Sequence, residues 1–297
     1  MALATSWSTA LGLDVPVVNA PMGGAAGGRL AAAVSRAGGL GMIGMGSAAT
    51  AEQLRTELAE LGELDRPFGI GLVHWVMAGE PGLLDVALAA RPALLSVSFG
   101  ADWDWVRAAH AAGVPVATQV ATPEDARAAV DAGVDVIVAR GAEGGGHGRP
   151  AVATLPLLAE VLDLVDAPVL AAGGVSSARA LAAVLAAGAA AAWVGTAFAT
   201  CAEALTPPPA RAELLAAEGA GTELTSAYDV AAGYRWPPDI PERVLRGSPV
   251  NAGQGVGAVR AVAPAAEVLR ALGDGAEALL RRWGPRPDGP RDSREHG

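Results

Sequence analysis

A glycine-rich segment that ends in a histidine is the part of the sequence best suited to chemistry. Residues 139–148 read Ala-Arg-Gly-Ala-Glu-Gly-Gly-Gly-His-Gly and follow a β-branched run over 134–138 that is apolar except for Asp135. Such a run is typical of a buried strand, and glycines let a flat ligand approach the backbone closely. His147 can exchange a proton near neutral pH. We therefore interpret the segment as part of an active site, with His147 as the candidate catalytic residue.

Two further glycine turns could bind an anion through backbone N–H groups. Residues 171–175 (Ala-Ala-Gly-Gly-Val) and 194–196 (Val-Gly-Thr) each follow a short apolar run. N–H groups at the start of a helix favour phosphate through their geometry and the helix dipole. The sequence contains no lysine, so backbone donors are the natural phosphate clamp. The candidates are Gly173, Gly174, Gly195 and Thr196, and an ordinary pair of tight turns is the alternative interpretation.

The composition excludes several kinds of chemistry. Without lysine there is no Schiff base, which excludes class I aldolase and pyridoxal phosphate mechanisms, and no Walker A motif. One cysteine and four histidines predict neither a disulfide nor a Cys-His metal cluster, and we expect Cys201 to be a buried, inert thiol. The formal charge of −10 argues against nucleic acid as the main partner.

Eight apolar runs alternate with helical patterns and are expected to position these groups. The strands are predicted at 15–20, 40–43, 68–73, 94–98, 114–119, 134–139, 168–172 and 191–194. Uniformly apolar strands joined through helices indicate parallel pairing that is buried on both faces. The count predicts an α/β fold, a (β/α)8 TIM barrel with its active site at the carboxyl ends of the strands. An open, doubly wound sheet is the alternative.

The chain beyond the barrel divides into three predicted segments. Residues 1–205 form the barrel, and 206–254 form a substrate cap in which 219–250 are irregular and hold both tyrosines. Residues 255–283 pack back on the barrel through a helix at 264–282, and 284–297 form a disordered tail. The first residues lack the pattern of a signal peptide, which predicts a cytoplasmic protein. The charge-free run 180–202 is interpreted as helix, turn and strand, so no membrane partner is expected.

Four motifs together resemble the nitronate monooxygenase family, formerly called 2-nitropropane dioxygenases. They are residues 19–24 (Asn-Ala-Pro-Met-Gly-Gly), the glycine run up to His147, the turn at 171–175 and residues 194–198 (Val-Gly-Thr-Ala-Phe). The resemblance covers about residues 11–204, with a looser similarity at 252–257. The flavin-dependent enoyl-acyl-carrier-protein reductases share the same pattern.

The resemblance implies an FMN-binding barrel with His147 facing the substrate beside the flavin. The residues that it assigns to FMN are Ala20, Pro21 and Met22 against the ring, Gln119, Gly141 and Gly146 nearby, and Gly173, Gly174, Gly195 and Thr196 at the phosphate. Two departures from the family stand out. Residues 69–72 lack an asparagine that the family carries, and Arg140 stands where glutamine is often found. Arg140 could stabilise an anionic reduced flavin or point to solvent.

The resemblance further implies oxidation of an alkyl nitronate, such as propionate 3-nitronate, by O2 to a carbonyl compound and nitrite. His147 would act as a base or as an electrostatic partner. An enoyl-thioester reductase that uses NAD(P)H is one alternative, and a barrel that binds flavin or a sugar phosphate without turnover is another. The partners are then a small-molecule substrate and O2, and a homodimer is left open. The expected substrate pocket consists of His74, Trp75, Tyr228 and Trp236, with no metal.

Overall fold

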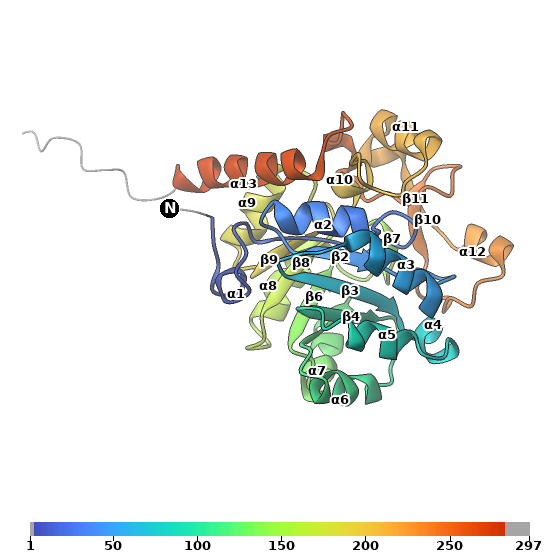
Figure 1. Ribbon diagram of the computed structural model, residues 1–297. Coiled ribbons are helices and arrows are strands. Elements are labelled where there is room, and N and C mark those ends of the chain that lie inside the picture. The colour runs from blue at the N-terminus through green and yellow to red at the C-terminus, as the bar shows by residue number, and fades with distance from the viewer. Residues whose placement is uncertain (1–2, 283–297) are drawn as a thin grey trace, which may run out of the picture.

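Eight parallel strands form a barrel in the computed structural model, which describes residues 3–282 (Figure 1). They are β1 (Val17–Asn19), β2 (Gly41–Gly44), β3 (Phe68–Val73), β4 (Leu94–Ser98), β5 (Val116–Val120), β6 (Val136–Arg140), β8 (Val169–Ala172) and β9 (Ala191–Val194). The strand order is β1-β9-β8-β6-β5-β4-β3-β2. A parallel bridge between Val18 and Leu40 joins the two ends of this series. The barrel prediction is therefore confirmed and the open-sheet alternative is wrong.

Helices surround the barrel and connect its strands. The connecting helices are α2 (Gly28–Arg36), α3 (Ala51–Leu61), α4 (His74–Gly79), α5 (Leu83–Ala89), α6 (Asp104–Ala111), α7 (Pro123–Asp131), α8 (Thr154–Leu162) and α9 (Ala178–Ala186), with α1 (Ser6–Ala10) ahead of β1 and α10 (Thr196–Ala199) after β9. Capping boxes at Thr50 and Thr122 define where α3 and α7 begin. Within residues 3–282, no helix is long and apolar enough to cross a membrane.

The strands separate two layers of hydrophobic core. Val136 and Val138 pack inside the barrel, whereas Ile137 and Ala139 pack outward against the helices. This alternation follows from the two-residue period of a strand. It continues to Arg140, whose side chain therefore points toward the barrel axis at the carboxyl end of β6. Gln119 follows the inward-facing Ala117 of β5 in the same way.

A small antiparallel sheet covers the carboxyl ends of the strands. Its order is β10 (Thr222–Thr225), β11 (Glu242–Leu245) and β7 (Gly146–His147). The same region contains α11 (Pro208–Ala216), η1 (Gly219–Gly221), α12 (Ala227–Ala232) and η2 (Gln254–Ala258). The prediction that 219–250 are irregular is wrong. Strands this short show no recognisable alternation of apolar and polar residues in the sequence. The two-residue strand β7 also depends on β11, which supplies its hydrogen-bonding partner.

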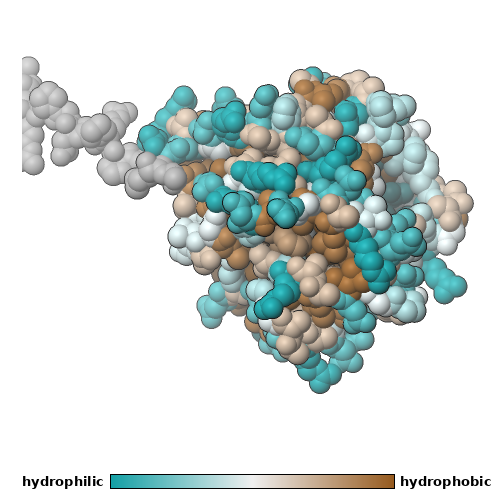
Figure 2. Space-filling view, viewed as in Figure 1, coloured by the Kyte–Doolittle hydropathy of each residue, from teal (hydrophilic) through white to brown (hydrophobic). Residues whose placement is uncertain are grey.

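The last helix, α13 (Ala265–Arg281), lies along α9 and α2 on the outside of the barrel (Figure 1). Its buried residues Ala265, Leu269, Leu272 and Ala276 recur at helical spacing. Hydrophilic side chains are spread over the face of the molecule seen in Figure 2, with hydrophobic ones between them. The predicted tail, 284–297, lies outside the described residues.

Candidate active site

A cavity of about 760 Å³ opens at the carboxyl ends of the barrel strands. The loops after β1, β2, β8 and β9 form its walls, together with Gln119, Arg140 and the glycine run. The cap contributes Asp229, Tyr234, Trp236 and Glu242. This is the end at which TIM barrels carry their active sites, and the cap forms one wall of the cavity there.

The His147 ring is held on two sides by residues of the cap. Its Nε2 lies 2.8 Å from Oδ2 of Asp229, and the two side chains are only 14% and 7% exposed. The ring stacks on Trp236 with a centroid distance of 3.5 Å and an interplanar angle of 7°. Trp236 donates its indole N–H to Oγ of Ser47 at 3.0 Å. The imidazole is therefore fixed in both position and orientation before any ligand binds.

A second carboxyl group, Glu242, stands opposite His147. The two residues are partners in the β7–β11 register. Burial, followed by the nearby Asp229 charge, raises the pKa of Glu242 to about 7. Burial also lowers the pKa of His147, while the hydrogen bond and charge of Asp229 oppose that shift. His147, Asp229 and Glu242 place ligand atoms within 4.8 Å of one another, close enough to share a proton or hold a cation.

Arg140 is a buried cation with no carboxylate bound to it. The residue is 4% exposed, and its Nη2 donates to the carbonyl oxygens of Gly144, Gly145 and Gly146. Its Nη1 is buried and has no hydrogen-bond partner among residues 3–282. Burial, together with the charge of Arg243, lowers the pKa of Arg140 to about 10. The solvent-facing alternative for Arg140 is therefore wrong.

A second part of the cavity wall, here called the backbone end, is built from backbone. Gly173 and Gly174 adopt φ values of +109° and +71° after β8. Gly195 caps α10, and the hydroxyl of Thr196 accepts a hydrogen bond from the N–H of Gly253 at 3.0 Å. All four predicted phosphate ligands, Gly173, Gly174, Gly195 and Thr196, line the cavity. Left-handed backbone of this kind presents N–H groups without side chains in the way.

The residues that surround the cavity fit a flavin with its phosphate. Glycines leave clearance where a ligand would lie, and the orphaned Nη1 of Arg140 needs an acceptor because an unpaired buried charge is costly. The polar acceptors of a flavin ring would supply one. The carboxamide of Gln119 makes no hydrogen bond with any described residue, so it too is free to bind a ligand.

Glu143 and Gly141 support the glycine run rather than the cavity. The Glu143 carboxylate accepts hydrogen bonds from the N–H and hydroxyl of Thr154 at 2.8 and 2.7 Å, and its carbonyl accepts one from Gln254. Glu143 therefore shapes the loop through both its side chain and its backbone. A Cβ on Gly141 would lie 2.3 Å from the Thr154 hydroxyl, so Gly141 allows close packing beneath the site.

The remaining predicted residues divide between the cavity wall and the layer behind it. The wall includes Ala20, Pro21, Met22, Gln119, Gly146 and Trp236, but not Gly141, His74, Trp75 or Tyr228. Trp75 packs its edge against Trp236 at 5.7 Å, and His74 packs against Gly100. Burial raises the pKa of Cys201 to about 12, so its thiol stays protonated, as expected of an inert residue.

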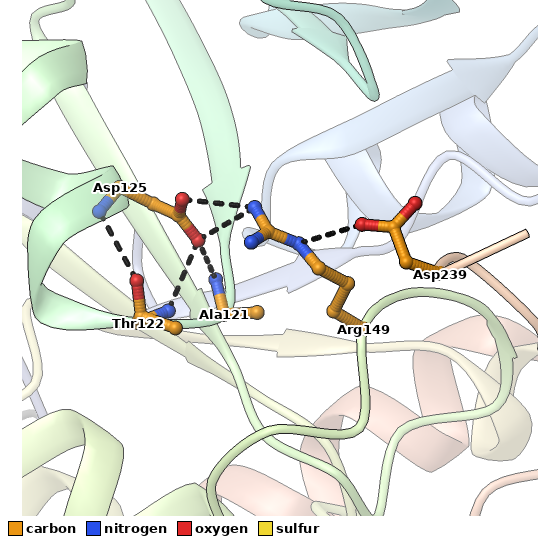
Figure 3. A network of polar contacts seen from close by, with 5 residues as sticks. All are labelled: Ala121, Thr122, Asp125, Arg149 and Asp239. Carbon is orange, nitrogen blue, oxygen red and sulfur yellow. Dashed lines mark hydrogen bonds and ion pairs between the residues drawn. The ribbon is translucent and has the colours of Figure 1, made fainter. Parts of the chain in front are cut away.

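A second cavity, of about 400 Å³, adjoins the first through Phe99, Gln119 and Arg140. Its polar side is an ion-pair network around Arg149 (Figure 3). Arg149 donates to both oxygens of Asp125 at 2.8 and 2.9 Å and lies 3.8 Å from Asp239. Phe99 has a φ of +72°, which is rare for a residue with a side chain.

Sequence reasoning did not find Asp229 or Glu242. Both lie in the cap, 82 and 95 residues beyond His147, and neither belongs to a motif. A polar residue in an irregular stretch carries no signal of its own. Their burial beside His147 is what distinguishes them from the exposed acids of the chain.

Comparison with known proteins identifies the family. A family model described as nitronate monooxygenase matches residues 5–81 and 76–234. The chain belongs to the nitronate monooxygenase family. It is 33% identical to a nitronate monooxygenase of Pseudomonas aeruginosa, with 88% of this chain and 96% of that protein aligned. The chain is accordingly an oxidoreductase of a family whose members use flavin.

Proteins with other activities are also similar to the chain. A Rhodococcus jostii protein, (3aS,4S,5R,7aS)-5-hydroxy-7a-methyl-1-oxo-octahydro-1H-indene-4-carboxyl-CoA dehydrogenase, is 33% identical over 89% of this chain and 72% of its own length. The structure of FabK from Thermotoga maritima superposes with a TM-score of 0.82 at 26% identity, covering 94% and 98% of the two chains. The structure of nitroalkane oxidase from Streptomyces ansochromogenes superposes with a TM-score of 0.82 at 29% identity, and the superposition covers 94% of this chain and 100% of that chain.

Proposed function

We propose that this nitronate monooxygenase family member binds FMN and oxidises alkyl nitronates, such as propionate 3-nitronate, with O2 to a carbonyl compound and nitrite. The observation that carries the proposal is one cavity with two different ends. One end offers the backbone donors of Gly173, Gly174 and Gly195, and the other holds His147 between Asp229 and Trp236.

The chain's own residues would hold the cofactor across this cavity. Gly173, Gly174, Gly195 and Thr196 would bind the phosphate. The backbone of Ala20, Pro21 and Met22 would lie against the ring, and Gln119 and Arg140 would donate to its polar atoms. FMN supplies the two-electron oxidation of the substrate and the return of those electrons to O2. The protein's part is to bind, to orient and to exclude water.

His147 acts on the substrate from the cap side of the cavity. A nitronate carries negative charge on its two oxygens, so N–H donors and positive charge at this end would orient it. The buried Arg140 guanidinium provides such charge through its position behind the glycine run. Trp236 and the neighbouring Phe99, with ring centroids 5.0 Å apart, shield the same end from water.

A second candidate function is reduction of an enoyl thioester with NAD(P)H. The resemblance to FabK and to a dehydrogenase of an acyl-CoA supports it. The net charge of −10 does not favour docking of an acidic carrier protein, so we rank this function second. Binding of flavin or a sugar phosphate without turnover ranks third.

The test begins with the visible spectrum of the purified protein. We expect flavin absorption bands and release of FMN, identified by mass, on denaturation. Anaerobic addition of propionate 3-nitronate should bleach the flavin, and NADPH alone should not. Bleaching by NADPH and not by the nitronate would favour the reductase. A colourless protein that cannot be reconstituted with FMN would contradict both flavoenzyme proposals.

A further inference from the structure

Three side chains of metal-binding type meet at the end of the cavity that holds His147. A ring nitrogen of His147 and one carboxylate oxygen each from Asp229 and Glu242 lie within 4.8 Å of one another. All three residues line the cavity, and no other such group of three occurs in residues 3–282. The sequence predicted no metal because its cysteine and histidines form no cluster, whereas two of these ligands are acids that only the cap brings to His147.

The carboxylate of Glu242 has no partner within the described part of the protein. Glu242 is only 5% exposed, yet its side chain makes no hydrogen bond or ion pair with any residue in 3–282. Because it lines the cavity, a ligand there can reach it. A buried carboxylate without a partner is costly. The arrangement is therefore complete only when a ligand supplies the missing partner.

The charges around the cluster favour a cation as that ligand. Asp229 is also buried, and its only ion-pair partner among the described residues is His147. The neighbouring arginines bind other groups, since Arg140 donates to carbonyl oxygens of the glycine run and Arg243 donates to a carbonyl and a hydroxyl oxygen. The charge of Arg140 opposes a cation here, but two carboxylates outweigh it. A doubly charged ion would neutralise both carboxylates.

The donor set selects the kind of cation. One imidazole nitrogen and two carboxylate oxygens suit zinc and other divalent first-row transition metals. Magnesium and calcium prefer oxygen ligands alone. Three protein ligands leave a further coordination position open toward the cavity. Bonds from zinc to nitrogen and oxygen are about 2.0 to 2.2 Å long, so two ligand atoms on one tetrahedral zinc ion lie about 3.4 Å apart.

The protein already holds two of the three ligands near that spacing. Nε2 of His147 lies 2.8 Å from Oδ2 of Asp229, and stacking on Trp236 fixes the plane of the imidazole ring. Glu242 stands directly opposite His147 in the β7–β11 register, so the two side chains share one face of the small sheet. Only the Glu242 carboxylate then has to move inward, and no hydrogen bond to a described residue holds it back.

We propose that His147, Asp229 and Glu242 form a site for one divalent transition-metal ion, with zinc as the best match, and that this ion and the substrate exclude each other. Binding breaks the hydrogen bond between Nε2 and Asp229. The single proton of that bond leaves to water, and both atoms turn to the metal. The metal site does not depend on the proposed function, whereas the exclusion of the substrate rests on it.

Zinc binding can be measured without any substrate. The full chain as purified, freed of metals with EDTA and desalted, would be titrated with zinc chloride by calorimetry. We expect one zinc ion per chain in the wild type. The Kd should be about a hundredfold higher in Glu242→Gln and in Asp229→Asn, because each variant loses a ligand. Magnesium at about a hundredfold excess should not displace zinc.

The chain offers a matched control pair on its surface. Nε2 of His110 lies 2.9 Å from Oδ2 of Asp135, close to the spacing in the cluster, but the two side chains are 43% and 42% exposed. No third ligand among residues 3–282 stands beside this pair. Asp135→Asn should therefore leave the affinity for zinc unchanged. X-ray absorption of the wild-type complex should show one imidazole ring and ligand distances of about 2.0 to 2.2 Å.

Inhibition gives a second readout. Zinc should inhibit the oxidation of propionate 3-nitronate by the wild type in competition with the nitronate, and EDTA should restore the rate. Glu242→Gln, compared with its own rate without zinc, should need about a hundredfold more zinc for the same inhibition.

Every other outcome contradicts a defined part of the inference. A wild type that binds no zinc, or equally tight binding by Glu242→Gln, would overturn the site. Loss of binding in Asp135→Asn would assign the ion to the surface pair instead. Zinc binding without any effect on nitronate oxidation would overturn the exclusion of the substrate. A wild type that binds zinc as expected but oxidises no nitronate would overturn the proposed function and leave the metal site standing.

Discussion

The two ends of the main cavity are built in different ways. The end assigned to phosphate uses backbone from residues 173–196, within two consecutive strand-to-helix turns of the barrel. The end that holds His147 uses side chains from β7, α12 and β11, which meet only because the cap folds over the barrel. The proposed cofactor site is thus a local feature of the barrel, whereas the part that holds His147 is assembled over long sequence distances. Substitutions at the backbone end should therefore weaken FMN binding, whereas substitutions at the end that holds His147 should change the rate of oxidation or the pH dependence of stability.

The largest effect is expected at the backbone end. A Cβ on Gly173 would lie 2.8 Å from the Thr154 hydroxyl and 3.0 Å from the carbonyl oxygen of Gly141, at a φ of +109°. Strain and overpacking together cost about 4 kcal/mol, so we expect Gly173→Val to weaken FMN binding about a thousandfold. Fluorescence titration of the apoprotein of each variant with FMN measures the dissociation constant.

Gly62→Val is the control for Gly173→Val. Gly62 also has a positive φ, +67°, but no atom lies within 4 Å of the added Cβ, and it is remote from the cavity. The Gly62→Val variant should have a lower free energy of unfolding than the wild type and the same affinity for FMN. Equal FMN affinity in Gly173→Val and the wild type would contradict the placement of the phosphate.

The next effect is a pH dependence of stability at the assembled end. The pKa of Glu242 rises from 4.5 to about 7 on folding, so the folded state binds more protons than the unfolded state in this range. Stability is then lost as pH rises from about 4.5 to about 7, by roughly 3 kcal/mol at most. Glu242→Gln should remove this loss. Urea unfolding of both proteins at pH 5 and pH 8 tests the prediction.

Glu223→Gln on the neighbouring strand β10 is the control for Glu242→Gln, because Glu223 bonds to the N–H of Gly247 away from the cavity. Its difference in stability between the two pH values should match that of the wild type. If Glu242→Gln loses as much stability between pH 5 and pH 8 as the wild type does, then Glu242 is not the buried group responsible.

His147→Gln should separate catalysis from cofactor binding. We expect a loss of about tenfold in nitronate oxidation, because the imidazole contributes orientation and charge but no proton transfer to this substrate. FMN affinity should stay within about threefold of the wild type, since His147 is not among the proposed phosphate ligands. The measurements are stopped-flow bleaching and FMN titration. A variant that lost its flavin would contradict the separation of the two ends.

The smallest effect is expected at Ser47, which supports Trp236 from the β2 loop. Ser47→Ala removes the hydrogen bond to the indole N–H, which is 3.0 Å long, and should cost about 1 kcal/mol in unfolding free energy. The His147 ring would lose part of its support, so nitronate oxidation should fall by about twofold. Thermal unfolding and steady-state assays measure the two effects. If Ser47→Ala lowered the rate as much as His147→Gln does, the support from Trp236 would contribute as much to nitronate oxidation as the imidazole itself.

Much of the barrel was predictable because its signals are local. The strands at 68–73, 94–98 and 191–194 occur where the apolar runs indicated. The other strands were predicted within two residues of their ends. Hydrophobic periodicity and caps act over a few residues. The same local character made the glycine turns at 173–174 and 195 recognisable as candidate phosphate ligands.

The cap was not predictable in the same way. The sequence by itself determined the barrel, the glycine turns, the absence of lysine and the place of His147 in the glycine run that follows β6. Only the tertiary structure decided that residues 146–147 pair with β11, that Arg140 is buried, and that Asp229 and Glu242 flank His147. The physical reason is that the contacts of β7 and His147 join segments about a hundred residues apart in the chain, and that Arg140 is buried only once the glycine run folds over it. Their stability comes from burial and mutual pairing rather than from any local preference.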